Sequence, residues 1–380
     1  MVNNFDIAVP AKYTDMNNNR TIPLETLSQM ISVINPAATI HEAELAQSGH
    51  LSVYHLVIET PTRATDWVLK ASPDGERHGI DTEARLLSIV EDQTSIPVPT
   101  VLGAVDAHET LPAPYFLMES VNGIKVPKRE IGELSDKALK RMSRQTGRYL
   151  AELHSLDGPE GYGQVDIVPS QSLEGGRPSV DLNQLTITDL QGGSSTDSNE
   201  WPAVLRMWAE NTLERHVSTR FEDMTEEIRS IVLERIESME GPFRPVLGRI
   251  DHGLHNLLLE PETGAITGMI DWAFTLSVPG AYDLVCVEAN LSLGPWSIHS
   301  ATPDRRQLIR TNLLEGYQEI GQSVIVDQFQ QHHATYELLA LLRAMNHLDL
   351  VTEFVMPDAT DEQVNATAQK YRNLVTDLSE

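Results

Sequence analysis

The stretch Leu247–Trp272, LGRIDHGLHNLLLEPETGAITGMIDW, decides how the rest of the chain is interpreted. Asp251 and Asn256 lie in a segment rich in glycine and histidine, and the short apolar run LLLE follows them. The turn residues PETG separate this run from a second one, AITGMI, which ends at Asp271. This order predicts a β-hairpin. Because a hairpin brings the residues before its first strand beside those after its second, we expect Asp251, Asn256 and Asp271 to lie close together.

The side chains in this stretch allow two kinds of metal site. Two carboxylates and one amide oxygen suit Mg²⁺, which takes oxygen ligands and keeps waters for substrate phosphates. Alternatively, Asp251 with His252 and His255 could form the zinc site of a metal-dependent hydrolase. On a loop the spacing of the two histidines says little, and no motif marks a third, distant histidine. We therefore favour the magnesium interpretation.

A lysine and a glutamate far upstream form a second candidate site. Lys70 ends the apolar run WVLK, and Glu83 lies in the first turn of the helical segment that follows, DTEARLLSIVED. In kinases, a strand lysine paired with a helix glutamate holds the α and β phosphates of the nucleotide. The alternative is a solvated lysine and an ordinary acid at a helix N-terminus. Together with the Asp251 to Asp271 stretch, the pair favours phosphate binding. The turn QSGHLS, which ends at Ser52, is either a phosphate-facing turn or a plain hairpin turn, and we assign Ser52 to the nucleotide site.

The central stretch resembles the aminoglycoside phosphotransferase family, part of the wider protein-kinase-like fold. That family carries His-Gly-Asp, four further residues and Asn, then a hydrophobic strand and Ile-Asp-Trp or a close variant. The resemblance implies that Asp251 is the catalytic aspartate and that Asn256 and Asp271 bind Mg²⁺. This chain departs from the motif at two positions, where Arg249 stands in place of the usual His and Ile250 in place of the Gly.

The resemblance also implies a fold and a division of the chain. We expect an α+β, bilobal protein-kinase-like fold with a small β-rich N-terminal lobe and a larger, mainly helical C-terminal lobe. Backbone groups of Glu119 and Val121, in the hinge between the lobes, would hold the adenine edge of ATP. The expected parts are an N-terminal lobe over 1–118 with a loose arm over 1–22, a hinge over 119–123, and a C-terminal lobe over 124–380 with a catalytic loop at 249–256 and a metal-binding hairpin at 257–272.

Apolar periodicity predicts most of the remaining elements. Helices are expected at 22–34, 134–156, 201–220, 224–239, 304–320, 328–354 and 361–378 and from Pro279-Gly280 onward, and strands within 40–59, at 66–71, at 101–107 and within 113–120. The segment 161–200, rich in Gly, Ser, Asp and Pro, is expected to be a disordered insertion or a loop that covers the substrate. His154, at the end of a predicted helix, and Asp283 are expected to be structural.

Composition limits the classes of protein to which the chain can belong. The 380 residues include 55 Asp and Glu against 28 Lys and Arg, which gives a formal net charge of −27. This acidity indicates either a solvated, halophile-like surface or a field that attracts cationic substrates. It disfavours binding of nucleic acid through phosphates. The single cysteine, Cys286, excludes an intrachain disulfide. Without a signal peptide or a membrane-length apolar run, we expect a soluble, cytoplasmic protein that binds no membrane.

These observations together predict an ATP-dependent small-molecule kinase. With ATP and Mg²⁺ as cofactors, it would move the γ-phosphoryl group to a hydroxyl of a small molecule. The alternative is a catalytically silent, kinase-like protein that binds a nucleotide or ligand, to which Arg249 in place of His gives some weight. The family acts on aminoglycosides, macrolides, choline, homoserine and sugars, and the sequence assigns neither an acceptor among these nor an oligomeric state.

Overall fold

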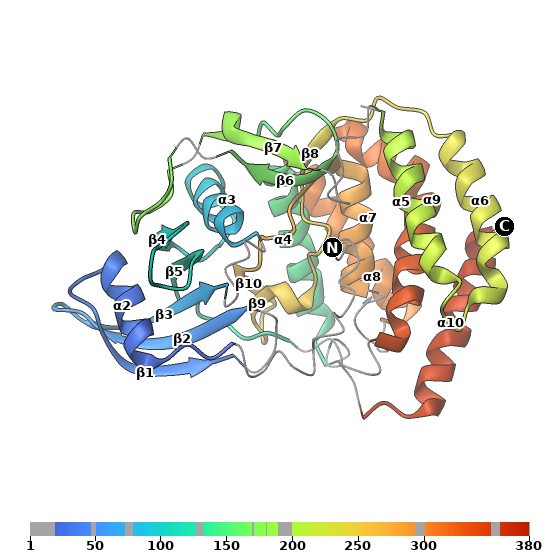
Figure 1. Cartoon of the computed structure of the whole chain (residues 1–380). Helices are drawn as coiled ribbons and strands as arrows, with labels where there is room; N and C mark the ends of the chain where they lie inside the picture. Colours follow the sequence, from blue (N-terminus) through green and yellow to red (C-terminus); the bar gives the residue numbers. More distant parts are fainter. Residues whose placement is uncertain are drawn as a thin grey trace. The chain divides into compact units, whose positions relative to one another are not determined.

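The chain divides into two compact units, which are described separately below. The computed structural model describes residues 20–46, 51–72, 79–126, 131, 133–168, 171–179, 181–188, 200–292, 301–350 and 358–379 (Figure 1). The first unit comprises Met1–Asn122, Val165–Gly193 and Gly268–Phe274, and the second comprises Gly123–Gln164, Ser194–Thr267 and Thr275–Glu380. The predicted lobes are continuous in sequence, whereas the first unit includes two segments that lie within the predicted C-terminal lobe. The predicted lobe and hinge boundaries stay a prediction.

The first unit is built on a five-stranded antiparallel sheet in the order β1-β2-β3-β5-β4. Its strands are β1 (Thr39–Leu45), β2 (Ser52–Glu59), β3 (Ala64–Ala71), β4 (Val101–Val105) and β5 (Tyr115–Glu119). Strand β2 alternates buried and more exposed side chains, as expected for a strand with one face against a core. The predicted strands are therefore present.

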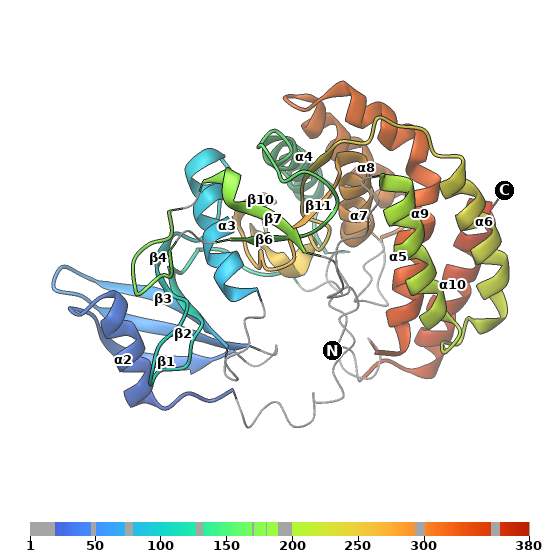
Figure 2. The ribbon, with the colours of Figure 1, turned by 45° about the horizontal axis from the view of Figure 1, so that its top comes forward.

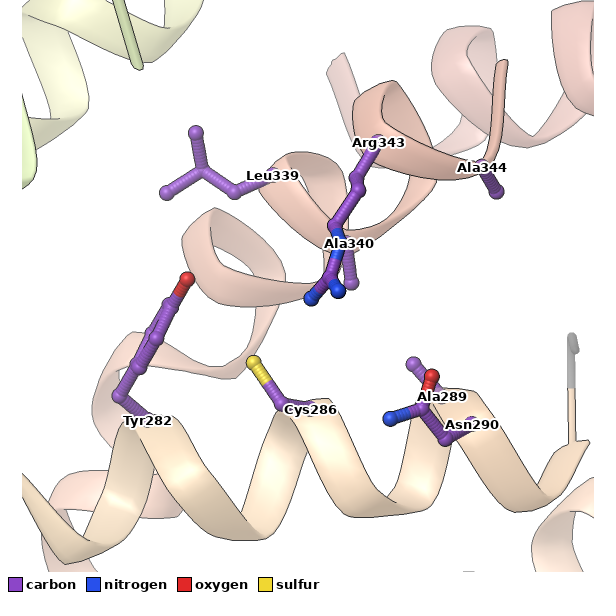
Figure 3. Close-up of a pocket in the computed structure, with 8 residues that line it drawn as sticks. All are labelled: Tyr282, Cys286, Ala289, Asn290, Leu339, Ala340, Arg343 and Ala344. Carbon is purple, nitrogen blue, oxygen red and sulfur yellow. The ribbon is translucent and has the colours of Figure 1, made fainter. Parts of the chain in front are cut away.

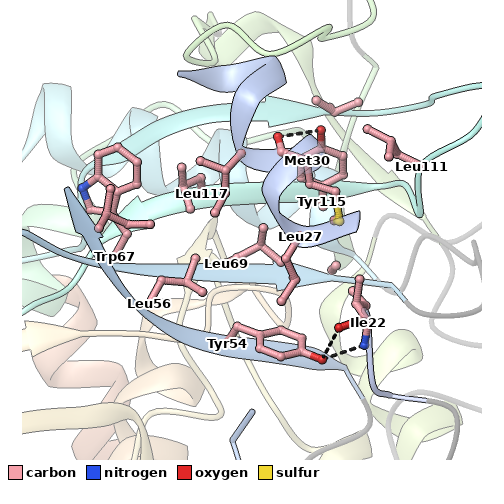
Figure 4. Close-up of a cluster of buried hydrophobic side chains, with 14 residues drawn as sticks. Ile22, Leu27, Met30, Tyr54, Leu56, Trp67, Leu69, Leu111, Tyr115 and Leu117 are labelled. Carbon is pink, nitrogen blue, oxygen red and sulfur yellow. Dashed lines mark hydrogen bonds between the residues drawn. The ribbon is translucent and has the colours of Figure 1, made fainter. Parts of the chain in front are cut away.

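One face of this sheet packs against helix α2 (Leu24–Ile34). The helix buries Leu27, Met30 and Ile31, which recur at the three- and four-residue spacing of a single helix face. Figure 4 shows these side chains gathered with apolar residues of β2, β3 and β5. Each fully buried side chain of this size contributes about 1.5–3 kcal/mol to folding. This cluster holds the sheet, and β3 with it, in a fixed orientation.

The alternation of side chains along β3 places Lys70. Trp67, Leu69 and Ala71 belong to the cluster under α2. Successive strand residues point to opposite faces, so Lys70 projects from the other face of the sheet. Helix α3 (Ile80–Gln93), which packs against β4 and β5, buries every residue from 80 to 90. Lys70 and the N-terminal turn of α3 therefore lie on the same face of the sheet.

Arg20 and Ile22, the last part of the predicted arm that the structure describes, are held by hydrogen bonds. Residues 1–19 lie outside the described part of the chain, but Arg20 and Ile22 are buried. The Arg20 Nε donates to the Leu51 carbonyl at 2.9 Å, and the Ile22 N–H donates to the Tyr54 hydroxyl at 2.6 Å. These bonds fix the chain just before α2.

The second unit is mainly helical. Helices α5, α6, α9 and α10 lie side by side, as Figure 2 shows, and α7 packs against both α8 and α9. The helices are α4 (Asp136–Leu153), α5 (Trp201–His216), α6 (Thr225–Glu237), α7 (Gly280–Ser292), α8 (Pro303–Gln318), α9 (Ser323–Leu350) and α10 (Asp361–Ser379). Each predicted helix is present with boundaries shifted by a few residues. Among the described helices, none combines the length and hydropathy needed to span a membrane.

Two glycines allow α4 and α8 to approach closely. A Cβ on Gly147 would lie 1.9 Å from the Leu313 carbonyl oxygen, and one on Gly316 would lie 1.9 Å from the Arg144 carbonyl oxygen. No side chain fits at either position. The two helices therefore touch backbone to backbone.

Four short strands are absent from the sequence-based prediction. They are β6 (Gly163–Ile167), β7 (Leu185–Thr188), β8 (Pro245–Gly248) and β11 (Leu276–Pro279). Strand β11 pairs antiparallel with β8 and with the first residues of β6. The expectation of an irregular segment over 161–200 is therefore wrong where β6 and β7 form; residues 169–170, 180 and 189–199 lie outside the described part.

The predicted hairpin is present. Strands β9 (Leu257–Glu260) and β10 (Ala265–Met269) form a two-stranded sheet. The Gly264 N–H donates to the Glu260 carbonyl at 2.8 Å and closes the turn, where Gly264 has a φ of 70°. A side chain is disfavoured at that φ, and a Cβ there would also lie 2.0 Å from the Ala138 carbonyl oxygen.

Candidate active site

Lys70 lies between two carboxylates in the first unit. Its Nζ donates to Glu83 Oε2 at 2.5 Å and to Asp271 Oδ1 at 3.0 Å. The Lys70 and Glu83 side chains are 9% and 2% exposed, whereas the Asp271 side chain is 44% exposed. The predicted Lys70–Glu83 pair therefore forms, and Asp271 joins it with one side open to solvent.

The backbone around Asp271 is held in an unusual conformation. Asp271 has a φ of 63°, in the left-handed region that residues other than glycine rarely adopt. The next residue secures it, because the Trp272 N–H donates to Glu83 Oε1 at 3.1 Å and the Trp272 indole donates to the Met269 carbonyl at 3.0 Å. Strain of this kind persists where surrounding contacts enforce it, which is common at functional sites. One glutamate thus positions both the lysine and the turn that carries Asp271.

The charge on Lys70 is stabilised. Burial alone would lower the pKa of Lys70, but the Asp271 and Glu83 carboxylates outweigh burial and raise that pKa above its ordinary value. The lysine is therefore a permanent cation at neutral pH, with an exposed carboxylate beside it.

In the second unit, the segment between β8 and β9 carries Asp251 and Asn256. The chain turns after β8, where the His252 N–H donates to the Arg249 carbonyl at 2.7 Å, and then forms a short 3-10 helix, Leu254–Asn256. The Asn256 Nδ2 donates to the Asp251 carbonyl at 2.9 Å and lies 3.4 Å from Asp251 Oδ2. The amide nitrogen thus faces Asp251, which leaves the amide oxygen as the atom available to a cation.

Asp251 is buried but charged. Burial alone would raise its pKa, but His255, whose Nε2 lies 3.5 Å from Asp251 Oδ1, and the more distant Arg343 and Arg249 hold the pKa of Asp251 well below its usual range. The aspartate is therefore ionised at any physiological pH. It can accept a hydrogen bond from an incoming hydroxyl but is a weak base before that hydroxyl reacts.

The zinc alternative gains no support from the two histidines. His252 is fully buried, its Nε2 lies 3.4 Å from the Thr146 hydroxyl, and burial with the nearby Arg249 holds the pKa of His252 well below its usual value. His255 faces Asp251. Among the described residues, no group of three His, Cys, Asp or Glu side chains could hold a metal ion.

A side chain from a helix far along the chain braces the Asp251 segment. The Asn290 Nδ2 of α7 donates to the Ile250 carbonyl, immediately before Asp251. The His154 ring bonds the Tyr317 hydroxyl at 3.0 Å and Asp283 Oδ2 at 2.9 Å, which gives His154 and Asp283 the structural contacts expected of them. Asn290 and Arg343 had no sequence signal, because they lie on helices far along the chain from Asp251.

The remaining predicted nucleotide contacts belong to the first unit. Ser52 begins β2, is fully buried, and donates its hydroxyl to the Arg20 carbonyl at 2.6 Å. Glu119 ends β5, where its N–H donates to the Thr100 carbonyl at 2.9 Å, and Val121 follows half-buried. Their roles toward a nucleotide stay predictions. So does the convergence of Asp271, in the first unit, with Asp251 and Asn256, in the second.

A comparison with protein families decides the identity of the chain. The model of the phosphotransferase enzyme family, APH, matches residues 42–321. The chain belongs to this family. The predicted phosphotransferase function of this APH protein is thereby confirmed. No curated protein sequence matches it.

Solved structures resemble this APH protein over nearly its whole length. A Ralstonia eutropha JMP134 protein assigned as an aminoglycoside phosphotransferase gives a TM-score of 0.59 at 13% identity, covering 94% of this chain and 97% of that one. Wild-type aminoglycoside 2'-phosphotransferase-IIIa in complex with GDP gives a TM-score of 0.55 at 14% identity, covering 94% of this chain and 99% of that one. A thermostable mutant of APH(4)-Ia gives a TM-score of 0.53 at 14% identity, covering 93% of this chain and 99% of that one. Because the sequence identities are this low, the structural matches show the fold alone. They confirm the predicted α+β, kinase-like class.

Proposed function

We propose that this APH-family phosphotransferase transfers the γ-phosphoryl group of ATP to a hydroxyl of a small molecule. The observation that carries the proposal is Lys70, which bonds Glu83 at 2.5 Å and the exposed Asp271 carboxylate at 3.0 Å. A permanent cation fixed by a buried glutamate is the device that kinases use to bind nucleotide phosphates. An ordinary strand-end lysine would be solvated instead.

The donor atoms of Asp271 and Asn256 fit Mg²⁺. Asp271 offers a partly exposed carboxylate. Asn256 offers its amide oxygen, since its amide nitrogen donates to the Asp251 carbonyl. Both are hard oxygen ligands of the kind that Mg²⁺ prefers. We propose that these two residues hold the ion; when bound, it would neutralise charge on the β and γ phosphates.

The chain's own residues would then perform the transfer as follows. Lys70 binds nonbridging phosphate oxygens, and Asp251 accepts a hydrogen bond from the acceptor hydroxyl and aims its oxygen at the γ-phosphorus. A new oxygen–phosphorus bond forms as the bond to the β–γ bridging oxygen breaks. Because the pKa of Asp251 is low, the hydroxyl proton passes to it late, once the new bond has acidified that proton. Positioning and charge neutralisation supply most of the catalysis in such a transfer.

We further propose that the adenine edge meets the backbone of Glu119 and Val121, in a hinge over 119–123 between an N-terminal and a C-terminal lobe.

Ser52 differs from the other assigned residues. Its hydroxyl already donates to the Arg20 carbonyl, so any contact from Ser52 to a phosphate would come from its backbone.

The substitution Asp251→Asn tests the proposal. It should lower ATP-dependent phosphorylation about 10²–10⁴-fold, the contribution of a well-placed general base. The affinity for Mg·ATP should be nearly unchanged, because Asp251 is not assigned to the nucleotide. ADP release is measured over a panel of amines, sugars and amino alcohols at low and at molar salt.

Asp327→Asn is the matched control, since Asp327 is exposed on α9 of the same unit. It should match the wild type. Undiminished turnover by Asp251→Asn would remove that residue from the reaction. Binding of Mg·ATP without turnover of any acceptor would instead identify a catalytically silent binding protein.

A further inference from the structure

A small cavity lies between α7 and α9 in the second unit. Figure 3 shows Tyr282, Cys286 and Asn290 on α7 facing Arg343 on α9, whose guanidinium points across the space toward α7. The cavity holds about 30 Å³. A single water needs roughly 10–15 Å³ by the same measure, so the cavity accommodates a group of two or three heavy atoms rather than a whole molecule.

This cavity borders the segment that carries Asp251. Asn290, which lines it, donates to the Ile250 carbonyl, and the Cβ of Asn290 lies 3.5 Å from the position a Cβ would occupy on Gly253. The positive charge of Arg343 also reaches Asp251, because it helps to hold the pKa of that aspartate low. A molecule that reaches both groups would meet Asp251 through a hydroxyl and Arg343 through an anionic group.

The polar side chains that line the cavity are one cation, Arg343, and three neutral groups. The Arg343 Nε is buried and has no hydrogen-bond partner among the residues that the structure describes. Burial raises the pKa of the Cys286 thiol to about 12 and that of the Tyr282 hydroxyl well above its usual value, so both groups keep their protons. Tyr282 and Cys286 also hydrogen-bond each other. A cation with an unused N–H, set among neutral groups, suits an anion of planar shape, which arginine binds in preference to lysine.

We infer that the phosphate acceptor is a small hydroxy acid whose carboxylate occupies this cavity and binds Arg343, an inference that rests on the proposed phosphoryl transfer. A carboxylate has three heavy atoms, which matches the volume. An aminoglycoside or an amino alcohol would instead place ammonium groups beside the guanidinium, where like charges repel. The net charge of −27 does not change this choice, since surface charges are screened beyond roughly 8 Å at physiological salt.

Three acceptors with the same sugar ring test the inference: glucuronate, glucose and glucosamine, which carry a carboxylate, no charge and an ammonium group. In ATP-coupled assays, the kcat/KM for glucuronate should exceed both others. Arg343→Gln should lower the kcat/KM for glucuronate about tenfold to hundredfold, the value of a hydrogen bond to a charged group, chiefly through KM. Glucose has no carboxylate, so Arg343→Gln should lower its kcat/KM only through the effect of Arg343 on Asp251, by a clearly smaller factor than for glucuronate. Arg343→Lys should restore part of the loss.

A binding measurement separates this inference from the proposed function. Glucuronate should raise the Tm of the wild-type protein, because a ligand that binds only the folded state stabilises it. It should not raise the Tm of Arg343→Gln, whereas the control Arg206→Gln, at an exposed position on α5, should behave as wild type. Binding of glucuronate without turnover of any acceptor would overturn the proposed transfer but support the anion site. Preferential turnover of glucosamine, or no preference among the three compounds in turnover and Tm, would overturn the inference.

Discussion

At the scale of residues, the contacts of Lys70 on β3 could be predicted from the sequence, whereas those around the Asp251 segment could not. Lys70 and Glu83 are close in sequence, and the end of a strand followed by the first turn of a helix leaves few ways to arrange them. Their pairing could therefore be predicted. Asn290 and Arg343 reach the Asp251 segment only through the packing of α7 and α9. No local pattern encodes such contacts, so the cavity could not be foreseen.

The buried pair predicts a specific loss of stability. Lys70→Met leaves Glu83, 2% exposed, without its cation, and should lower the free energy of unfolding by about 3–5 kcal/mol. The double variant Lys70→Met with Glu83→Met should recover part of this loss, since the uncompensated charge is gone. Urea denaturation at pH 7 measures both. Arg63→Met is the control, because its ion pair with Glu119 spans 3.7 Å between exposed side chains and should contribute little.

The same pair also fixes a pH window. The folded-state pKa of Lys70 is raised, so its contribution is fully present below the unfolded value, about 10.4, and is lost as the pH rises through the folded value. In the Lys70→Met variant Glu83 stays buried without a cation, so burial raises the pKa of Glu83. The destabilisation should therefore grow as the pH rises from 6 to 9, because the variant must then keep Glu83 ionised without its partner. A single variant as stable as wild type at pH 9, or a loss that shrinks as the pH rises across that window, would contradict a buried, charged lysine.

At the scale of elements, periodicity foretold the helices and the first sheet but not the second set of strands. Strand β11 is four residues long and wholly buried, so it shows none of the alternation that marks a strand. Strand β6 does alternate, with Gly163, Val165 and Ile167 buried. That signal was present, but it lay in a segment whose glycine and serine content indicated a loop.

The contact between α4 and α8 predicts the effect of one methyl group. Gly316→Ala would place a Cβ 1.9 Å from the Arg144 carbonyl oxygen, so the helices must separate. Overpacking of this kind costs typically about 1–3 kcal/mol, and here backbone faces backbone, so we expect the upper end or more. Thermal unfolding should show a clear fall in Tm. Gly176→Ala is the control, because no atom lies within 4 Å of its Cβ position, and its Tm should not fall. Equal Tm values for the two variants would mean that α4 and α8 are not in close contact.

At the scale of the whole molecule, the family and fold were within reach of the sequence, while the assembly of the proposed site was not. The spacing of Asp251, Asn256 and Asp271 carries the family resemblance, and the family match over residues 42–321 bears it out. The hairpin that joins them is present. Yet Asp271 and Lys70 belong to one compact unit, and Asp251 and Asn256 to the other. The account requires Lys70, Asn256 and Asp271 to hold one bound nucleotide with its ion, and Asp251 to hold the acceptor hydroxyl beside it.

A double-mutant cycle tests this requirement most directly. The affinity for Mg²⁺ with a nonhydrolysable ATP analogue is measured by calorimetry for wild type, Asn256→Ala, Asp271→Ala and the double variant, with the metal-free nucleotide as reference. If both residues hold the same ion, their effects should be coupled by more than about 0.5 kcal/mol with Mg²⁺ present and should be additive without it. Additive effects in the presence of Mg²⁺, or an Asp271→Ala variant with wild-type affinity, would contradict a shared magnesium–nucleotide site.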